Sequence, residues 1–255
     1  MSYISFQPND YFNTLLHTGN DASPRSLTGV GFQPDFVWLK RRNSASSHTL
    51  YDAVRTAGSA KGLASNANAI EGLSSTEGTT ANYGYVNSFD SDGFSVTTGA
   101  SNDNYVNNSG DTYVSWNWKA NGAGSSNTDG SITSTVSAST TSGFSIVKYT
   151  GDGTTGQTVG HGLGSVPKLI INKQLTSQNW FVYHHSIGNT KVLKLNTTDA
   201  ETTTSGWNNT TPTSSVFTIG TSSSTNVSGV DFINYCFAEK KGFSKFGLYQ
   251  GNANA

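Results

Sequence analysis

The sequence predicts an all-β protein of two tandem β-sandwich or jelly-roll modules related by internal duplication. Ser, Thr, Asn and Gly are abundant among the 255 residues, and no long stretch repeats apolar residues with a helical period, so helices should be few and short. Short runs of β-branched and aromatic residues, bounded by Gly, Asn, Asp and Pro, recur throughout and are typical of such folds. The third observation is that the second half of the chain repeats the first.

The repeat is clearest around one apolar run in each half. Three residues that flank this apolar run recur 133 positions later: Gly29 as Gly162, Pro34 as Pro167 and Lys40 as Lys173. Near the end of each half, residues 110–118 and 229–237 both keep aromatic residues in an alternating pattern. Because successive strand residues point to opposite faces, this alternation predicts one buried strand face in place of a reactive group.

Strands are predicted in both modules, and those of the first follow from the repeat. In the second module we expect them near residues 131–138, 143–150, 167–173, 179–184, 190–196, 214–220 and 229–238. The alternating segment 131–136 is predicted to open the second module, as Ile4-Ser5-Phe6 precedes the first strand of the first module.

Module boundaries follow from composition. Residues 121–127 are small, lack an apolar anchor and read as a linker. The predicted units are therefore a first β-sandwich module (1–126), a second, homologous module (127–241) and a C-terminal segment (242–255). That segment resembles residues 143–151 and is predicted to close the sheet of the second module or to be donated to another subunit. The candidate assembly residues are Ile4, Phe6, Phe243, Phe246 and Tyr249.

Bulk charge excludes some partners. Charged residues are 12% of the chain and the formal net charge is −1, which argues against nucleic acid or an acidic membrane as a partner. The basic run at 40–42 is expected to be a solvated strand end or turn. A lone cysteine, Cys236, rules out an intrachain disulfide and is predicted to be a buried thiol. Without a transmembrane stretch or an N-terminal signal pattern, the chain is expected to be soluble and not exported by the general secretory route.

No catalytic centre is predicted. Glycan-cleaving enzymes need two carboxylates facing one cleft, but Glu71, Glu77, Glu201 and Glu239 occupy no matched strand positions. The chain also lacks a nucleophile elbow and a phosphate-binding glycine loop. We therefore expect a protein that is not an enzyme and that uses no cofactor.

Metal binding is not predicted either. The run 89–94 contains Asp90-Ser91-Asp92-Gly93, which superficially suggests a calcium loop, but it lacks the downstream glutamate of an EF-hand and is better explained as a tight turn. His184 and His185 are adjacent on a predicted strand and should point to opposite faces, so they make a poor metal pair, and His161 has no ligand partner in sequence.

One polar loop is the candidate glycan site. Residues 202–212 surround Trp207 with hydroxyl and amide side chains, including Asn208 and Asn209, a combination that suits stacking and hydrogen bonding to a sugar ring. The alternative, which we favour, is that Trp207 folds back on its own module. Trp180 and Tyr183 are expected to be core or inter-module contacts.

Several ordered motifs resemble a family of repeat modules in bacteriophage virion proteins, common in phages of marine and cyanobacterial hosts. They are residues 31–40 (GFQPDFVWLK), 89–94 (FDSDGF), 113–120 (YVSWNWKA) and 159–164 (VGHGLG). The resemblance covers nearly the whole chain and implies concanavalin-like or jelly-roll modules. It carries no catalytic residue.

The resemblance implies a non-enzymatic virion structural protein of a tail fibre or other appendage, made in the host cytoplasm and involved in host-surface attachment. A homo-oligomer is expected, and a trimer fits fibre and spike modules. Its other expected partners are virion proteins of the tail or capsid and a host-surface glycan, without nucleic acid or membrane insertion. Two alternatives stay open: a capsid decoration or adaptor protein, which should bury residues 2–12 against a lattice, and a tailspike-type glycan depolymerase, which needs carboxylates about 5 to 9 Å apart.

Overall fold

The computed structural model describes residues 4–74, 78–102 and 104–252, and within them the protein is all-β with antiparallel sheets. Helix is confined there to one turn of α-helix, α1 (Thr80–Tyr83), and one 3-10 turn, η1 (Pro8–Asp10). No helix of this part of the chain is long and apolar enough to span a membrane. The prediction of few, short helices is confirmed.

The first half of the chain, up to β10, forms a sandwich of two sheets. Its strands are β1 (Phe12–Thr18), β2 (Arg25–Thr28), β3 (Phe36–Arg41), β4 (Thr49–Asp52), β5 (Leu63–Ala64), β6 (Leu73–Ser74), β7 (Gly78–Thr79), β8 (Tyr85–Asp90), β9 (Gly93–Thr97) and β10 (Thr112–Trp118). Five of them form a sheet in the order β1-β10-β3-β4-β5, and three form a second in the order β2-β9-β8. β6 and β7 make a separate hairpin.

The second half, from β11 onward, also contains two main sheets. Its strands are β11 (Ser125–Asn127), β12 (Ser134–Ser139), β13 (Phe144–Thr150), β14 (Gln157–Gly160), β15 (Leu169–Gln174), β16 (Phe181–His184), β17 (Lys191–Lys194), β18 (Thr202–Thr203), β19 (Val216–Ile219) and β20 (Asp231–Phe237). Eight strands form one sheet in the order β11-β12-β13-β20-β15-β16-β17-β18, and β14 pairs with β19.

The two halves share a strand order. The run β1-β10-β3-β4-β5 in the first half has the counterpart β13-β20-β15-β16-β17 in the second, and the pair β2-β9 has the counterpart β14-β19. The registers agree as well, since Phe12 lies opposite Trp118 where Phe144 lies opposite Phe237. We use this correspondence below to compare positions in the two halves.

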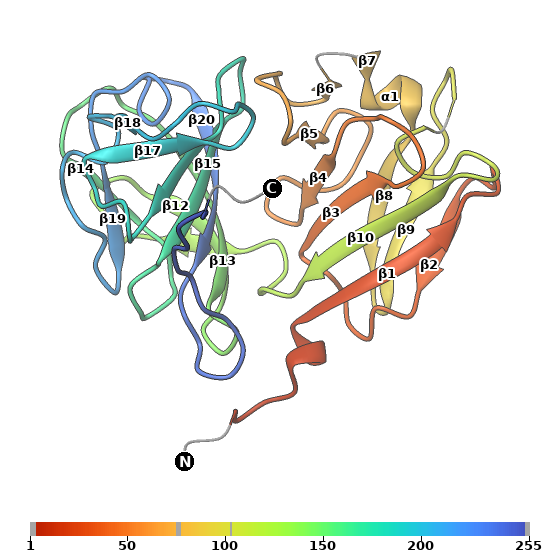
Figure 1. The fold of residues 1–255 in the computed structure, drawn as a ribbon, viewed down its shortest axis with the longest axis horizontal. Coiled ribbons are helices and arrows are strands. Elements are labelled where there is room, and N and C mark those ends of the chain that lie inside the picture. Colours follow the sequence, from red (N-terminus) through yellow and green to blue (C-terminus); the bar gives the residue numbers. More distant parts are fainter. Residues whose placement is uncertain (1–3, 75–77, 103, 253–255) are drawn as a thin grey trace.

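Four sheet layers stack across the molecule (Figure 1). One apolar core, with Tyr113 and Phe94 at its centre, fills the sandwich of the first half, and another, around Phe232 and Phe217, fills that of the second. A third core joins the halves, because the outer face of the five-stranded sheet packs on the eight-stranded sheet, with Phe36 against Tyr235 at a ring distance of 4.2 Å. The halves therefore share a buried interface.

Each strand predicted for the second half is present in the structure, with its ends displaced by up to three residues. The structure adds β11, β14 and β18, which are short and border glycine or polar loops, so their sequences carry little periodic signal. β11 lies inside the segment predicted as a linker and pairs along β12. Hydroxyl and amide side chains suit this position, because β11 is an edge strand without a core to cover.

The predicted closing strand at the C-terminus is wrong for the residues described there. Residues 242–251 contain no strand, and only an isolated bridge joins Lys240 to Ser244. The reason lies in the sheet order: β12 already occupies the edge of β13 where a closing strand would add. Donation of this segment to another subunit stays a prediction.

Candidate ligand-binding groove

An aromatic groove opens between the two halves. It is built on the outer face of the five-stranded sheet, where the pairing sets Trp116 beside Trp38, and Phe12 and Phe36 on either side of Trp118. Strand alternation explains why these side chains share a face: residues at the alternate positions of the same strands, such as Val37 and Tyr113, point into the core of the first half. We call these five outward-facing side chains, together with His48, the aromatic groove.

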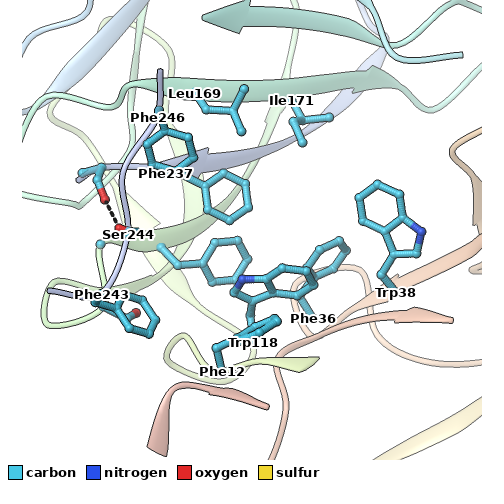
Figure 2. Close-up of a pocket in the computed structure, with 14 residues that line it drawn as sticks. Phe12, Phe36, Trp38, Trp118, Leu169, Ile171, Phe237, Phe243, Ser244 and Phe246 are labelled. Carbon is cyan, nitrogen blue, oxygen red and sulfur yellow. Dashed lines mark hydrogen bonds between the residues drawn. The ribbon is translucent and has the colours of Figure 1, made fainter. Parts of the chain in front are cut away.

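Two adjoining cavities make up the groove. The first, of about 350 Å³, lies between the halves, and Figure 2 shows Trp118 and Phe36 on one wall facing Leu169 and Phe237 on the other. The second, of about 270 Å³, is lined by Trp38, His48, Trp116 and Trp118. Trp38 and Trp118 border both cavities, so one continuous aromatic surface runs from the interface toward solvent.

Trp38 is held in place by a hydrogen bond. Its indole Nε1 donates to His48 Nδ1 at 3.0 Å, which leaves the Nε2 of that imidazole as the protonated nitrogen of the neutral ring. Burial, together with the charge of Lys40, lowers the pKa of His48, so the neutral form prevails at pH 7. The groove therefore offers stacking surfaces and few charges, which suits a neutral ligand with an apolar face.

The corresponding face of the second half is closed. Tyr235 stands in β20 where Trp116 stands in β10, yet Tyr235 is fully buried because the first half packs on it, whereas Trp116 is half-exposed. The two halves thus pack with one face covered and the other partly open. This asymmetry creates the groove.

Buried charges fix the two walls of the groove relative to each other. Arg55 Nε lies 2.6 Å from Asp52 Oδ2, and the hydroxyl of Tyr235, from the other half, donates to the same oxygen at 2.8 Å. Arg55 also donates to Glu71 at 2.9 Å. Burial, followed by the charge of Asp52, raises the pKa of Tyr235, which keeps the hydroxyl protonated as a donor. The network is too enclosed to meet a ligand and acts as a support.

Lys173 is a buried cation close to this network. Its side chain is fully buried and its Nζ donates to the carbonyls of Gln174 and Thr176. Burial, and secondarily the positive charge of Arg55, lowers the pKa of Lys173 to about 7. Folding therefore releases a proton from this lysine at pH values above 7.

This shift predicts a pH dependence of stability. Between pH 7 and the ordinary lysine pKa, the unfolded chain binds more protons at Lys173 than the folded chain, so the free energy of unfolding should rise with pH. From pH 7 to 9 the gain should be about 2 kcal/mol relative to Lys173→Met, measured by urea unfolding at each pH. Parallel curves for the two proteins would contradict the shift.

The glycan site predicted in the loop at residues 202–212 is wrong for its central residue. Trp207 is 2% exposed and packs edge-on against Tyr183, so it cannot stack on a sugar. The favoured alternative, a tryptophan folded back on its own half, is what the structure has. The physical reason is a missing strand: β19 has no neighbour equivalent to β8, and Trp207 fills the core there. Asn208 and Asn209 turn the loop with positive φ values of 48° and 50°.

The predicted assembly residues from the two ends of the chain partly meet. Phe6 contacts Phe243 with ring centroids 5.2 Å apart, and Ile4 lies near Gly242. Phe243 and Phe246 border the larger cavity of the groove, as Figure 2 shows. Tyr249 is 95% exposed and joins none of them. None of the five lies in a strand.

The remaining predicted contacts are confirmed. Trp180 is an inter-half contact: it is fully buried and its indole donates to the carbonyls of Ala64 and Ala67. Tyr183 lies in the core of the second half. Cys236 is a buried thiol, and burial raises its pKa far above the ordinary range.

The carboxylates considered for catalysis are engaged separately. Glu71 pairs with Arg55 and Lys61, Glu201 pairs with Lys191, and Glu239 accepts a hydrogen bond from the backbone of Phe246. Glu77 lies outside the described residues. No carboxylate lines either cavity of the groove in the part of the chain described.

The suspected metal loops are turns and caps. Ser91 and Asp92 form the turn between β8 and β9, as predicted, and the Asp92 carboxylate accepts hydrogen bonds from the amides of Gly29 and Gly31. His161 is fully buried and bonds backbone groups through both ring nitrogens, and burial lowers its pKa. Across residues 4–74, 78–102 and 104–252, no group of three or more His, Cys, Asp or Glu side chains is placed to hold a metal ion.

Sequence reasoning missed the tryptophans of the groove. Alternation in residues 110–118 predicts one buried strand face, and it indicates that the two faces differ without indicating which of them is covered. A usable signal existed: Trp116 and Trp118 fall on the face opposite to Tyr113, which already points to the core. Aromatic side chains on both faces of β10 imply that its second face also contacts something besides solvent.

Comparison with known proteins gives a family and no function. No curated protein and no solved structure matches the chain. A family described as Domain of unknown function (DUF7483) matches residues 7–255, nearly the whole length. The chain therefore belongs to that family.

Proposed function

We propose that this protein is a non-enzymatic binding module that recognises glycans through the aromatic groove, as an attachment component of a phage virion. The observation that carries the proposal is the half-exposed row of Trp38, Trp116 and Trp118 in two adjoining cavities. Sugar rings present an apolar face that stacks on such side chains. The virion setting rests on the motif resemblance alone.

The architecture proposed with it is a tandem duplication of a concanavalin-like or jelly-roll module. Its support is the shared strand order and register of the two halves together with the 133-residue recurrence of Gly, Pro and Lys. The two copies differ in how this sheet face is used. In the second copy the face is covered by the first half, and in the first copy part of the face stays open. A non-enzymatic role is favoured because the described groove lining holds stacking groups without an acid–base pair.

Binding should depend on Trp116. Replacing Trp116 with alanine should weaken binding to the best ligand about tenfold, since one lost aromatic stacking contact is worth about 1 kcal/mol or slightly more. The wild-type protein would be screened against bacterial lipopolysaccharides and capsular polysaccharides, and affinities compared by calorimetry. Trp116→Phe keeps a ring and should retain most of the affinity.

The controls separate this site from the earlier candidate. Asn209→Ala, in the loop of Trp207, should leave glycan affinity unchanged. If the wild-type protein binds no polysaccharide of the panel, or if Trp116→Ala binds as tightly as wild type, the glycan proposal is wrong. A capsid decoration role, the second candidate, would be favoured if the protein instead bound intact virions lacking it.

A further inference from the structure

The second half of the chain contains a strand that has no counterpart among the described residues of the first half. Residues 131–139 cross from one sheet to the other: Ser131 and Ile132 hydrogen-bond with Thr158 of β14, and β12 then pairs along β13. Val136 enters the core opposite Val147. This segment closes the side of the sandwich where the edges of β13 and β14 meet.

The same side of the first half is open. β1 and β2 correspond to β13 and β14, and each is an edge strand with one neighbour. Between them runs a groove of about 370 Å³ lined by residues 15–18 and 25–28. Leu16 is 61% exposed there and Leu15 is only partly buried. β1 has seven residues and no Lys, Asp, Glu or Pro. Side chains occupy two of its backbone groups, since the Thr14 amide donates to Asn13 Oδ1 and the Thr18 carbonyl accepts from Arg25, and the rest of this edge is a template for strand addition.

A difference in one connection explains the missing strand. Four residues, 140–143, join β12 to β13, and the last is Gly143 with a φ of +73°, which lets the chain fold back as a hairpin. Residues 8–11 stand before β1 in the same way, but the last is Tyr11 with a φ of −127°. A 3-10 turn forms there in place of a hairpin. The N-terminal arm, residues 4–7, therefore leads away from the edge of β1 (Figure 1).

The arm has the pattern of a strand without a sheet. Ile4 and Phe6 are half-buried, while Ser5 and Gln7 are exposed. Among the described residues, the backbone groups of Ile4, Ser5 and Phe6 make no hydrogen bond. Within the described part of the chain, side-chain contacts hold the arm, chiefly those of Phe6 with Phe243 and Tyr11. A strand-like segment with unpaired backbone groups gains hydrogen bonds wherever it meets a free edge.

We propose that the arm of a second copy of this chain adds to β1 as an antiparallel strand opposite residues 12–15 and covers that end of the open side. The correspondence with β12 and β13 sets the register: Ile4 would lie opposite Leu15, as Val136 lies opposite Val147. The arm cannot reach this position in its own chain without the left-handed turn that Gly143 provides. A neighbouring copy meets no such restriction, because its arm arrives without the connecting turn.

The charge pattern supports a second copy as the occupant. Neither the arm nor β1 carries an ionised side chain, since burial lowers the pKa of His17 and keeps it neutral. The cation that lines the groove, Arg25, donates to the Thr18 carbonyl and meets no charge on the arm. Identical chains therefore meet here without repulsion. Reciprocal exchange of arms in a closed ring pairs the β1 edge of every copy.

Disulfide trapping between two variants tests the exchange. Ile4→Cys and Leu15→Cys would be purified separately and reduced, then mixed and oxidised; native Cys236 is fully buried and should not react. The expected product is a covalent dimer that forms in the mixture and hardly at all with either variant alone. If the mixture gives no more dimer than the single variants, or if a chain carrying both cysteines closes on itself as a monomer, the proposal is overturned.

A substitution at the hinge provides a second, independent measurement. Tyr11→Gly permits the left-handed turn, so the arm should fold back on its own β1 and an oligomeric wild-type protein should become a monomer by light scattering. Tyr11→Ala removes the same ring without granting that turn and should remain oligomeric. The proposal is contradicted if the wild-type protein is a monomer at all concentrations, or if Tyr11→Gly and Tyr11→Ala have the same mass by light scattering. Neither measurement involves a glycan, so the proposal of arm exchange can be supported or contradicted independently of the proposed function.

Discussion

Replacing Arg55 with methionine should lower the free energy of unfolding by about 3–5 kcal/mol. Methionine keeps much of the volume of the arginine stem but removes the guanidinium that pairs with Asp52, whose carboxylate is 0% exposed. A carboxylate left in this position without its cation has lost water as well as its charged partner, and it keeps only two neutral donors, the Tyr235 hydroxyl and the backbone N–H of residue 55. Urea unfolding monitored by tryptophan fluorescence would measure the loss.

A double variant distinguishes the charge from the packing. Asp52→Asn combined with Arg55→Met removes both charges, and it should recover at least half of the stability lost in the single variant. Lys191→Met breaks an exposed pair with Glu201 and should change stability by less than about 1 kcal/mol. A loss for Arg55→Met no greater than that of Lys191→Met would show that the buried network contributes nothing.

Trp180→Ala should cost a similar amount, about 3–5 kcal/mol, for a different reason. The indole is fully buried in the core that joins the halves, and its Nε1 bridges the carbonyls of Ala64 and Ala67 in the first half at 2.9 and 3.1 Å. Alanine would leave a cavity and remove the indole donor from both carbonyls, of which Ala64 keeps only a long bond from the Ala67 amide at 3.3 Å. Because the lost contacts cross the interface, calorimetry should resolve two unfolding transitions where the wild-type protein has one.

Two variants control for ring loss. Trp116→Ala removes an equally large side chain from the open face, so its effect on stability should stay below about 1.5 kcal/mol while its effect on glycan binding is large. Trp180→Phe keeps most of the volume and should retain a single transition. A loss below 1 kcal/mol for Trp180→Ala, or one unchanged transition, would contradict the role of Trp180 in joining the halves.

Much of the fold was predictable because its signals are local. Alternation and turn residues marked the strands of the second half, and Asp92-Gly93 marked a hairpin turn through known backbone preferences. The contact between the halves was not predictable in the same way. It depends on which of the two apolar faces of a sheet is covered by the other half. That is a property of tertiary packing, and the alternation of residues along a strand does not reveal it.

The candidate site shows the same limit. Trp207 and Trp116 both stand among polar neighbours in the sequence, yet one is buried and the other half-exposed. The difference comes from strand count: a missing neighbour of β19 draws Trp207 inward, whereas an incomplete cover leaves Trp116 facing out. Neither cause can be recognised from the residues that surround Trp207 or Trp116 in the sequence.

The eight-stranded sheet lies between two apolar layers, and its central strands are buried almost continuously, as in β20, while β1 and β10 alternate. Substitutions should therefore be accepted at about every second position of β1 and β10 but at scarcely any in β15 or β20. Variation among related chains would then concentrate on the open face of the first half. Such a chain could change what it recognises while half of its sequence stayed nearly constant.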